Sequence, residues 1–440
     1  MNHFFNRLWS VLREFPRWLR PGLGIKRWLL LMMGGVTLLG LGIAVVVIDI
    51  YRTDSNDPTL LTLLSYASLR FLPRLLRALI FGGLGLVSIF YGMYKLSRSL
   101  LRPFLQPGLD MVNTLVDYQR RNRGPQIVTI GGGHGLSTLL RGLKAHTRNL
   151  TAVVTVADDG GSSGKLRQSF GILPPGDIRN CLAALSNDEA MLTQLFQYRF
   201  SGSPDLEGHS FGNLFITALA DITGSFESAV VESGRVLAVN GRVLPSTLHN
   251  VRLVASMELP DSVHEVRVEG ESKIPAMAGR VRRVWLEPDT APAFPPVIKA
   301  LLNADVIVVG PGSLYTSLLP NLLVHDLLAS LRASQAIKIY VCNIATQEGE
   351  TDAFSAFDHV SALEGYVGAD LFDVILCNNN FSGQLGPSSV WVRVDEKTLS
   401  DKRTYTADLT DNAYPWRHDA AKLAQVIMDI YDERTGPLRL

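Results

Sequence analysis

Two long apolar runs without charged residues lie near the beginning of the chain, at residues 28–48 and 78–94. At 1.5 Å per helical residue the first run is about 31 Å long, which matches the apolar core of a bilayer. The second run is short for a span, but it contains four glycines, which are common in membrane helices. The sequence therefore predicts two transmembrane helices. The alternatives are a signal peptide for the first run and a buried core helix for the second.

The charges around these runs predict their orientation. Basic residues precede the first run and follow the second, so the positive-inside rule places both ends in the cytoplasm and predicts an N-terminal membrane hairpin. Residues 60–77 are apolar with Arg70, Arg74 and Arg77 among them, a pattern also typical of a helix lying along the membrane surface. Whether this segment crosses, lies on or leaves the membrane stays open.

From residue 124 onward, short apolar runs alternate with stretches of helical periodicity. The runs predict buried strands at residues 126–130, 150–156, 305–309, 337–342 and 372–377, and helices are expected at 137–144, 177–185, 192–200 and 212–221. Continuous apolar strands separated by helices indicate a Rossmann-like α/β fold, with a mostly parallel sheet covered on both faces. Residues 235–287 alternate with a period of two, which predicts a small antiparallel insertion. Residues 105–124 read as a helical linker.

Composition and charge support a division of the chain into two parts of different character. The chain has 440 residues, 47% of them hydrophobic and only 19% charged, which excludes a disordered protein. Its three cysteines include no CxxC pair and exclude a disulfide scaffold. Residues 1–123 carry a net charge of +10, which leaves −9 for residues 124–440 although the whole chain is +1. An acidic body argues against nucleic acid as a partner. We therefore divide the chain into a membrane region, 1–123, and a cytoplasmic domain, 124–440.

Five polar turns follow predicted strands or begin predicted helices in this domain. Ligands of parallel sheets bind outside the carboxyl ends of the strands, so these turns form the candidate site. The first contains Gly131, Gly132, Gly133, His134, Gly135, Leu136 and Ser137; the second Asp158, Asp159, Gly160, Gly161, Ser162 and Ser163; and the third Pro175, Gly176, Asp177, Arg179 and Asn180. The fourth contains Gly310, Pro311, Gly312 and Ser313, and the fifth Asn343, Thr346 and Gln347.

The residue types in these turns favour an anionic ligand. Glycines allow close approach of the backbone, and a helix that follows offers free N–H groups to phosphate. Arg179, in the first turn of a predicted helix, opposes the helix dipole, and an anion would explain it. The structural alternatives are a tight strand-to-helix turn without ligand at the first turn, a solvated loop at the second, and a simple helix cap by Asp177.

Several familiar chemistries are excluded. The first turn lacks the GxGxxG spacing because position 136 is Leu, and in the second Leu166 replaces the Ser or Thr of a P-loop. No GxSxG elbow occurs, and His134 and His209 have no third partner at zinc-ligand spacing.

Taken together and in order, the motifs resemble those of the gluconeogenesis factor family, the YvcK-like proteins of the CofD-like superfamily. The matching stretches are GGGHGLSTLLRGLK (131–144), VTVADDGGSSGKLR (154–167), PPGDIRNCLAALS (174–186), LFQYRF (195–200), GHSFGNL (208–214), GESKIP (270–275), VVGPGSLYTSLLPNLLV (308–324) and NIATQEGET (343–351). The resemblance covers about residues 127–420. In this sequence His134 stands where the family usually has Thr, and the membrane hairpin is an addition to it.

The resemblance implies a fold, a ligand and a role. It implies a Rossmann-like domain that binds UDP-N-acetylglucosamine or a related dinucleotide and links carbon metabolism to cell-wall synthesis and cell shape. Gly131–Ser137 and Gly310–Ser313 would hold the diphosphate, Asp158 and Asp159 would meet the ligand or a metal, and Asn213 and Arg417 would join the cleft. An unidentified protein partner and a homo-oligomer are both compatible with such a role.

Two hypotheses follow. In the first, a membrane-tethered regulator binds UDP-N-acetylglucosamine and signals to a partner without catalysing a reaction. In the second, which follows the CofD-like relatives, the protein is a transferase of the 2-phospho-L-lactate type that moves a phospho-acyl group from a nucleotide diphosphate carrier. This second hypothesis calls for magnesium as cofactor, with Asp158 and Asp159 as the candidate catalytic residues. The residues favour neither mechanism by themselves, and the resemblance favours the regulator.

Overall fold

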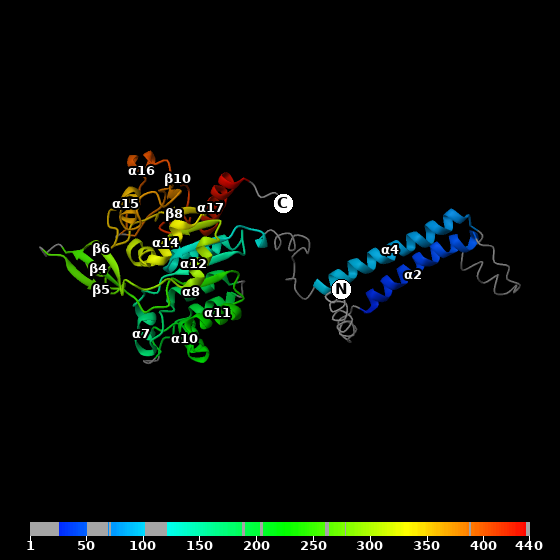
Figure 1. The fold of residues 1–440 in the computed structure, drawn as a ribbon, viewed down its shortest axis with the longest axis horizontal. Helices are drawn as coiled ribbons and strands as arrows, with labels where there is room; N and C mark the ends of the chain where they lie inside the picture. Colours follow the sequence, from blue (N-terminus) through cyan, green and yellow to red (C-terminus); the bar gives the residue numbers. More distant parts are fainter. Residues whose placement is uncertain are drawn as a thin grey trace. The chain divides into compact units, whose positions relative to one another are not determined.

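The fold was analysed in a computed structural model that describes residues 26–50, 69, 72–101, 121–186, 190–202, 206–259, 264–277, 279–386 and 389–436. The chain divides into two compact units, Met1–Val116 and Asp117–Leu440 (Figure 1). Most of the predicted linker, and most of residues 60–77, lie outside the described residues.

In the N-terminal unit two helices, α2 (Lys26–Ile50) and α4 (Arg74–Leu101), pack against each other. Their contacts run in opposite directions along the two sequences, so the pair is an antiparallel hairpin. A Cβ atom on Gly35 would lie 2.9 Å from the Gly85 carbonyl oxygen, and one on Gly92 would lie 2.7 Å from Met32 Cγ. Glycine at these positions lets the two backbones approach closely, as in membrane helix pairs.

The hairpin exposes most of its large apolar side chains, and where its side chains are described the buried positions are four glycines and Phe81. Outward-facing residues include Met33, Leu79, Val87 and Phe90, each more than 60% exposed. One stretch, Leu79–Leu96, is long and apolar enough to span a membrane, with a mean hydropathy of 1.5, whereas the apolar part of α2 is the shorter Leu30–Ala44. Of the two predicted spans, therefore, one passes this test of length and composition among the described residues.

The second unit contains a seven-stranded parallel sheet, with strand order β10-β9-β8-β7-β1-β2-β3. All its pairings are parallel. The strands are β1 (Ile127–Gly131), β2 (Leu150–Val154), β3 (Arg242–Pro245), β7 (Val306–Val309), β8 (Ile337–Val341), β9 (Val374–Asn378) and β10 (Thr404–Ala407). A separate antiparallel sheet has the order β5-β4-β6, from β4 (Arg252–Glu258), β5 (Val266–Glu269) and β6 (Arg280–Glu287). The predicted α/β architecture is confirmed.

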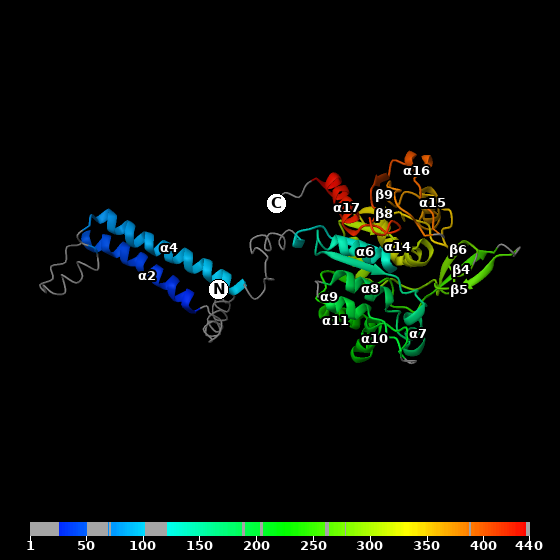
Figure 2. The same ribbon diagram turned by 180° about the vertical axis from the view of Figure 1, so that it is seen from behind.

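Helices cover both faces of the parallel sheet (Figure 2). Each face has its own hydrophobic core. One core is formed with α6 (Gly133–Leu143), α8 (Gly176–Leu185), α9 (Ala190–Gln197), α10 (Phe211–Thr223), α11 (Phe226–Val236) and α17 (Ala420–Thr435). The other is formed with α12 (Pro295–Leu302), α13 (Leu319–Leu322), α14 (His325–Ala333), α15 (Ala356–Val367) and the antiparallel sheet. Two further helices are α7 (Gly161–Phe170) and α16 (Glu396–Ser400).

The first and last helices of the domain lie against each other. A Cβ atom on Gly142 of α6 would clash with the backbone carbonyl of Ala420 and would lie 2.8 Å from Ala424 Cβ of α17. Glycine is therefore required for this approach, and α17 completes the cover of the first β–α unit.

The sequence prediction differs from the structure in the insertion and at two strands. The antiparallel strands begin at Arg252, whereas the predicted insertion, 235–287, also includes β3, which pairs in parallel with β2. Both β3 and β10 were missed because they lack a continuous apolar run: β3 begins with an exposed arginine and ends in a proline, and β10 is half-buried throughout. The other five predicted strands correspond to β1, β2, β7, β8 and β9.

Candidate functional site

The candidate site lies where the chain reverses its direction across the sheet. From β1 the chain moves outward through β2 and β3, then returns to β7 on the other side of β1 and continues outward through β8, β9 and β10. The loops after β1 and β7 therefore leave the sheet on either side of a crevice, which is where open α/β sheets bind ligands. These two loops are the first and fourth predicted turns.

The glycine turn after β1 is packed too tightly to carry side chains. A Cβ atom on Gly132 would lie 2.5 Å from Asp177 Oδ2, and one on Gly135 would lie 2.4 Å from the Pro311 carbonyl oxygen. Gly133 has a positive φ of 62° and is the first residue of α6. The turn thus holds the N-terminus of α6 directly against the loop that follows β7.

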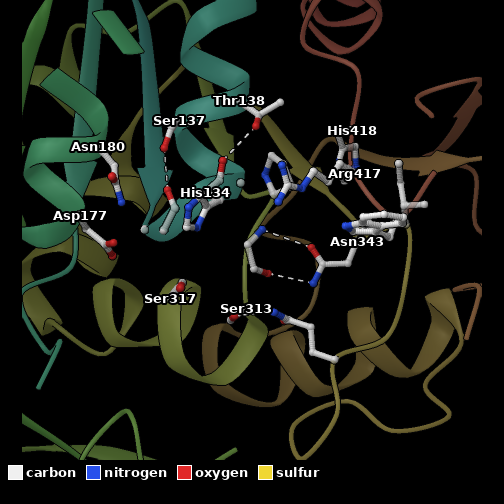
Figure 3. A pocket seen from close by; sticks show the side chains of 18 of the residues that line it. His134, Ser137, Thr138, Asp177, Asn180, Ser313, Ser317, Asn343, Arg417 and His418 are labelled. Atoms are coloured by element: carbon white, nitrogen blue, oxygen red, sulfur yellow. Dashed lines mark hydrogen bonds between the residues drawn. The ribbon is translucent and has the colours of Figure 1, made fainter. Parts of the chain in front are cut away.

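The turn after β7 is held by two amide side chains from the loop after β8. Asn343 accepts a hydrogen bond from the Gly312 N–H group at 3.2 Å and donates one to the Gly312 carbonyl oxygen at 3.0 Å (Figure 3). Gln347 Nε2 donates to Ser313 Oγ at 2.7 Å. Because these hydrogen bonds link the loops after two neighbouring strands, the backbone of the turn is fixed before any ligand binds.

A cavity of about 700 Å³, the main cavity, opens between these turns. Figure 3 shows His134 within it, Asp177 and Asn180 on one side, and Asn343, Arg417 and His418 on the other. Four arginines line it, namely Arg141, Arg179, Arg199 and Arg417. Four guanidinium groups around glycine turns and a helix N-terminus provide the donors that a phosphate or diphosphate group needs.

Arg179 is placed with particular precision. Its guanidinium donates to Ser210 Oγ and, at 2.8 Å, to Asn180 Oδ1, and it passes beside Gly212, where a Cβ atom would lie 2.8 Å from its side chain. Its buried Nε has no hydrogen-bond partner in the described part of the chain. These hydrogen bonds hold the guanidinium group in place and explain why an arginine is tolerated in the first turn of α8.

The electrostatics of the cavity shift the pKa values of its titratable groups. Burial, followed by the positive charge of Arg417 and the other arginines, lowers the pKa of His134, so the ring is neutral near pH 7. Burial and the neighbouring Asp158 raise the pKa of Asp177 to about 6, against a partial offset from the Gly133 N–H group. Burial and Asp158 also raise the pKa of Glu271, to about 9. The carboxyls near the cavity therefore carry less negative charge than their number suggests.

The two aspartates of the second turn are engaged elsewhere. Asp158 accepts the Gly160 N–H group at 2.8 Å and shares a hydrogen bond with Glu271, and Asp159 accepts the Ser272 N–H group at 2.9 Å. Within the described ranges, no group of three or more His, Cys, Asp or Glu side chains is arranged to hold a metal ion. The predicted magnesium ligands thus do not fit a metal site here, and they brace the second turn instead.

The predicted site residues fall into three groups. Fourteen line the main cavity: Gly132, Gly133, His134, Gly135, Ser137, Asp177, Arg179, Asn180, Pro311, Gly312, Ser313, Asn343, Gln347 and Arg417. Thr346 lines an adjoining cavity. The lining of these two cavities does not include Gly131, Leu136, Asp158, Asp159, Gly160, Gly161, Ser162, Ser163, Pro175, Gly176, Asn213 and Gly310. Leu136 is a core residue, and Asn213 donates to Ser162 Oγ in a buried network.

Sequence reasoning missed two of the four arginines. Arg141 lies on the same face of α6 as His134, Ser137 and Thr138, so the helical period could have revealed it. Arg199 follows α9 and reaches the cavity because its backbone bridges to Ser210, a pairing that leaves no local signal. Glu271, Trp416 and His418 also line the cavity and come from loops distant in the sequence.

The fold and the cavity define an α/β protein with an arginine-lined cavity at the switch point of its sheet. Comparison with known proteins gives the family. A family model described as 2-phospho-L-lactate transferase CofD matches residues 127–435. The chain is 50% identical over 255 residues to the gluconeogenesis factor of Bacillus subtilis, covering 58% of this chain and 79% of that protein. The chain belongs to the gluconeogenesis factor family (YvcK/UPF0052), whose shared domain is the CofD domain.

Two further relatives locate this domain within the chain. A crystal structure of a UPF0052 family protein from Bacillus halodurans is 41% identical, with a TM-score of 0.64, and covers 70% of this chain and 99% of that one. A relative from Nostoc sp., itself provisionally assigned as a gluconeogenesis factor, is 46% identical over 438 residues, covering 96% of this chain and 93% of its own length. The N-terminal extension is thus shared with some relatives and lies outside the match to others.

Proposed function

We propose that this protein is a regulator that binds a nucleoside diphosphate sugar, UDP-N-acetylglucosamine or a close relative, and links carbon metabolism to cell-wall synthesis and cell shape. In this proposal the ligand-bound domain passes a regulatory signal to a protein partner. Membership of the gluconeogenesis factor family supports the metabolic role, and the site supports the class of ligand.

One observation carries the proposal. A domain with a net charge of −9 collects four arginines around a single cavity, at the N-terminus of α6 and between two glycine turns. The net negative charge of such a domain would repel an anion at long range. The clustering of four arginines at one cavity is therefore best explained by an anionic ligand that binds there. A diphosphate, with two negative charges and oxygen acceptors on both phosphates, satisfies both the guanidinium groups and the free N–H groups.

The hairpin supports a membrane tether as part of the same proposal. Four of its glycines, Gly35, Gly42, Gly85 and Gly92, face the partner helix. Most of its large apolar side chains face outward, the reverse of a water-soluble helix pair. At one end Lys95 Nζ lies 5.6 Å from the Trp28 ring and 5.5 Å from the Tyr91 ring, a combination typical of the membrane–water interface. The tether would hold the regulator close to the machinery that makes the cell wall.

The binding proposal is tested by calorimetric titration of the full chain in detergent with UDP-N-acetylglucosamine. We expect micromolar binding, and Arg417→Gln should weaken it by about ten-fold, since a charge-assisted hydrogen bond is lost. Arg235→Gln, on the exposed face of α11, is the matched control. Absence of heat up to millimolar ligand would contradict the proposed function.

A transferase is the second candidate, and the carboxyls beside the cavity favour it. Asp177 and Glu271 have strongly raised pKa values, which is typical of acid–base sites, and the matching family model describes a transferase. Slow turnover of a nucleotide diphosphate carrier that disappears in Asp177→Asn, with binding retained, would favour this candidate. Binding without turnover would favour the regulator.

A further inference from the structure

A second cavity of about 630 Å³ adjoins the main cavity. The two share part of their walls, namely Glu271, Ser313, Ala345, Gln347 and Trp416. Because Ser313 belongs to the glycine turn after β7, a ligand held by that turn would extend directly into the second cavity. Together the two cavities form one cleft with two compartments.

The chemistry of the second compartment differs from that of the first. No lysine or arginine is among the described residues that line it, whereas four arginines line the main cavity. Its walls instead carry carboxyl and hydroxyl groups, from Glu271, Ser272, Thr316, Thr346, Glu348, Glu350 and Ser389. Such a surface offers many hydrogen-bond acceptors and donors but no cation to hold a phosphate.

Glu350 gives the strongest sign of a missing partner. The residue is 7% exposed, and its Oε1 accepts a hydrogen bond from Thr316 Oγ1 at 2.9 Å. Its buried Oε2 has no hydrogen-bond partner in the described part of the chain, and neither has Oε1 of the neighbouring Gln347. Buried polar atoms without a partner cost free energy, so two acceptors in one cavity wall point to a ligand that donates hydrogen bonds.

Trp416 lies at the junction of the two compartments. Its side chain contributes to both cavities and is 44% exposed. The ring is supported by an edge contact with Tyr414, at 5.5 Å between ring centroids. An exposed indole face beside hydrogen-bond acceptors suits a ligand group with an apolar ring face and hydroxyl groups at its edge.

We propose that the second cavity binds the uncharged, hydroxyl-rich glycosyl part of a nucleoside diphosphate sugar whose diphosphate lies in the main cavity, and that Glu350 and Trp416 select for it. This inference rests on the proposed function. Burial and nearby carboxyls keep Glu271 protonated near pH 7, so one wall carboxyl both donates and accepts hydrogen bonds, which suits hydroxyl groups better than an ammonium group.

The test compares UDP-N-acetylglucosamine with UDP, on the full chain in detergent. Wild-type protein should bind the sugar nucleotide at least ten-fold more tightly than UDP. Glu350→Gln replaces one acceptor oxygen of the carboxylate by a donor NH2 group. It should weaken the binding of the sugar nucleotide about ten-fold while changing the affinity for UDP less than two-fold. Trp416→Leu should act in the same direction, and Glu396→Gln, on an exposed helix, is the control.

The outcomes separate this inference from the proposed function. If UDP binds and the sugar adds no affinity, the assignment of the second cavity to the glycosyl part is wrong and the diphosphate site stands. The same conclusion follows if Glu350→Gln and Trp416→Leu lower the affinity for both ligands equally. If neither ligand binds, the proposed function fails and this inference fails with it. Retained UDP binding by a variant shows that the variant is folded.

Discussion

At the scale of single residues, a buried histidine in the wall of the main cavity makes the domain sensitive to acid. His418 Nε2 lies 3.2 Å from the Cys342 carbonyl oxygen, and burial lowers the pKa of His418 to about 4. The unfolded chain, with a histidine pKa near 6.5, therefore binds this proton more readily than the folded chain. Between about pH 6.5 and pH 4 the contribution of His418 to the stability of the domain therefore falls as the pH falls.

We predict that His418→Gln removes most of this contribution. Glutamine can still donate to the Cys342 carbonyl oxygen but does not titrate. Between pH 7 and pH 4.5 the free energy of unfolding should fall by about 2.5 kcal/mol less in the variant than in the wild type. Urea unfolding of the full chain in detergent measures this, with His249→Gln at an exposed position as the control. Equal losses in wild type and variant would contradict the assignment.

The sequence revealed some site residues and not others, for a physical reason. Glycine turns and helix starts are local signals, so the turns after β1 and β7 could be predicted. Arg199 and His418 reach the cavity from irregular segments held by isolated bridges, Arg199 to Ser210 and Thr410 to His418, which no helical or strand period reveals. The second turn was assigned to the ligand from its composition, whereas its aspartates accept backbone N–H groups.

At the scale of elements, the contact between α6 and the turn after β7 sets the width of the crevice. We predict that Gly135→Ala lowers the free energy of unfolding by about 2 kcal/mol, since the new methyl would lie 2.4 Å from the Pro311 carbonyl oxygen. Gly365→Ala, where a Cβ atom meets nothing within 4 Å in α15, should instead be neutral or stabilising. Urea unfolding distinguishes the two, and equal effects would mean that α6 can shift freely.

A matched pair of glycines also tests the hairpin. Gly85→Leu places a side chain where Cβ alone is 2.9 Å from the Gly35 carbonyl oxygen, so the helices must separate by about 2 Å. Gly83→Leu faces open space and should change nothing. Distances between spin labels at positions 33 and 93, which are both exposed, measure the separation. An unchanged distance in Gly85→Leu would show that the helices do not pack through this position.

Element prediction succeeded where burial imposed a strong pattern. The five continuous apolar runs correspond to β1, β2, β7, β8 and β9, because both faces of these strands are covered. The edge strands are different, since β3 ends in a proline and β10 is half-buried and contains two threonines and a tyrosine. Their positions depend on pairing with neighbours rather than on their own sequences.

At the scale of the whole molecule, the separation of the chain into two units makes the tether testable. We predict that deletion of residues 1–116 moves the protein from the membrane fraction to the soluble fraction, because the exposed apolar surface of the hairpin is removed. The full chain should resist extraction at alkaline pH, as an integral protein does. The truncated chain is measured by the same fractionation, and its continued presence in the membrane fraction would contradict the tether.

The contact between α6 and α17 has a consequence for biosynthesis. Gly142 and Ala420 touch, so the first β–α unit stays partly uncovered until the last helix has been made. At the usual rate of translation roughly 15 to 60 seconds pass between these two positions. The apolar hairpin leaves the ribosome before either. The domain is therefore completed only after α17 has been made, when the hairpin is already free to enter a bilayer, and the main cavity is among the later features to form.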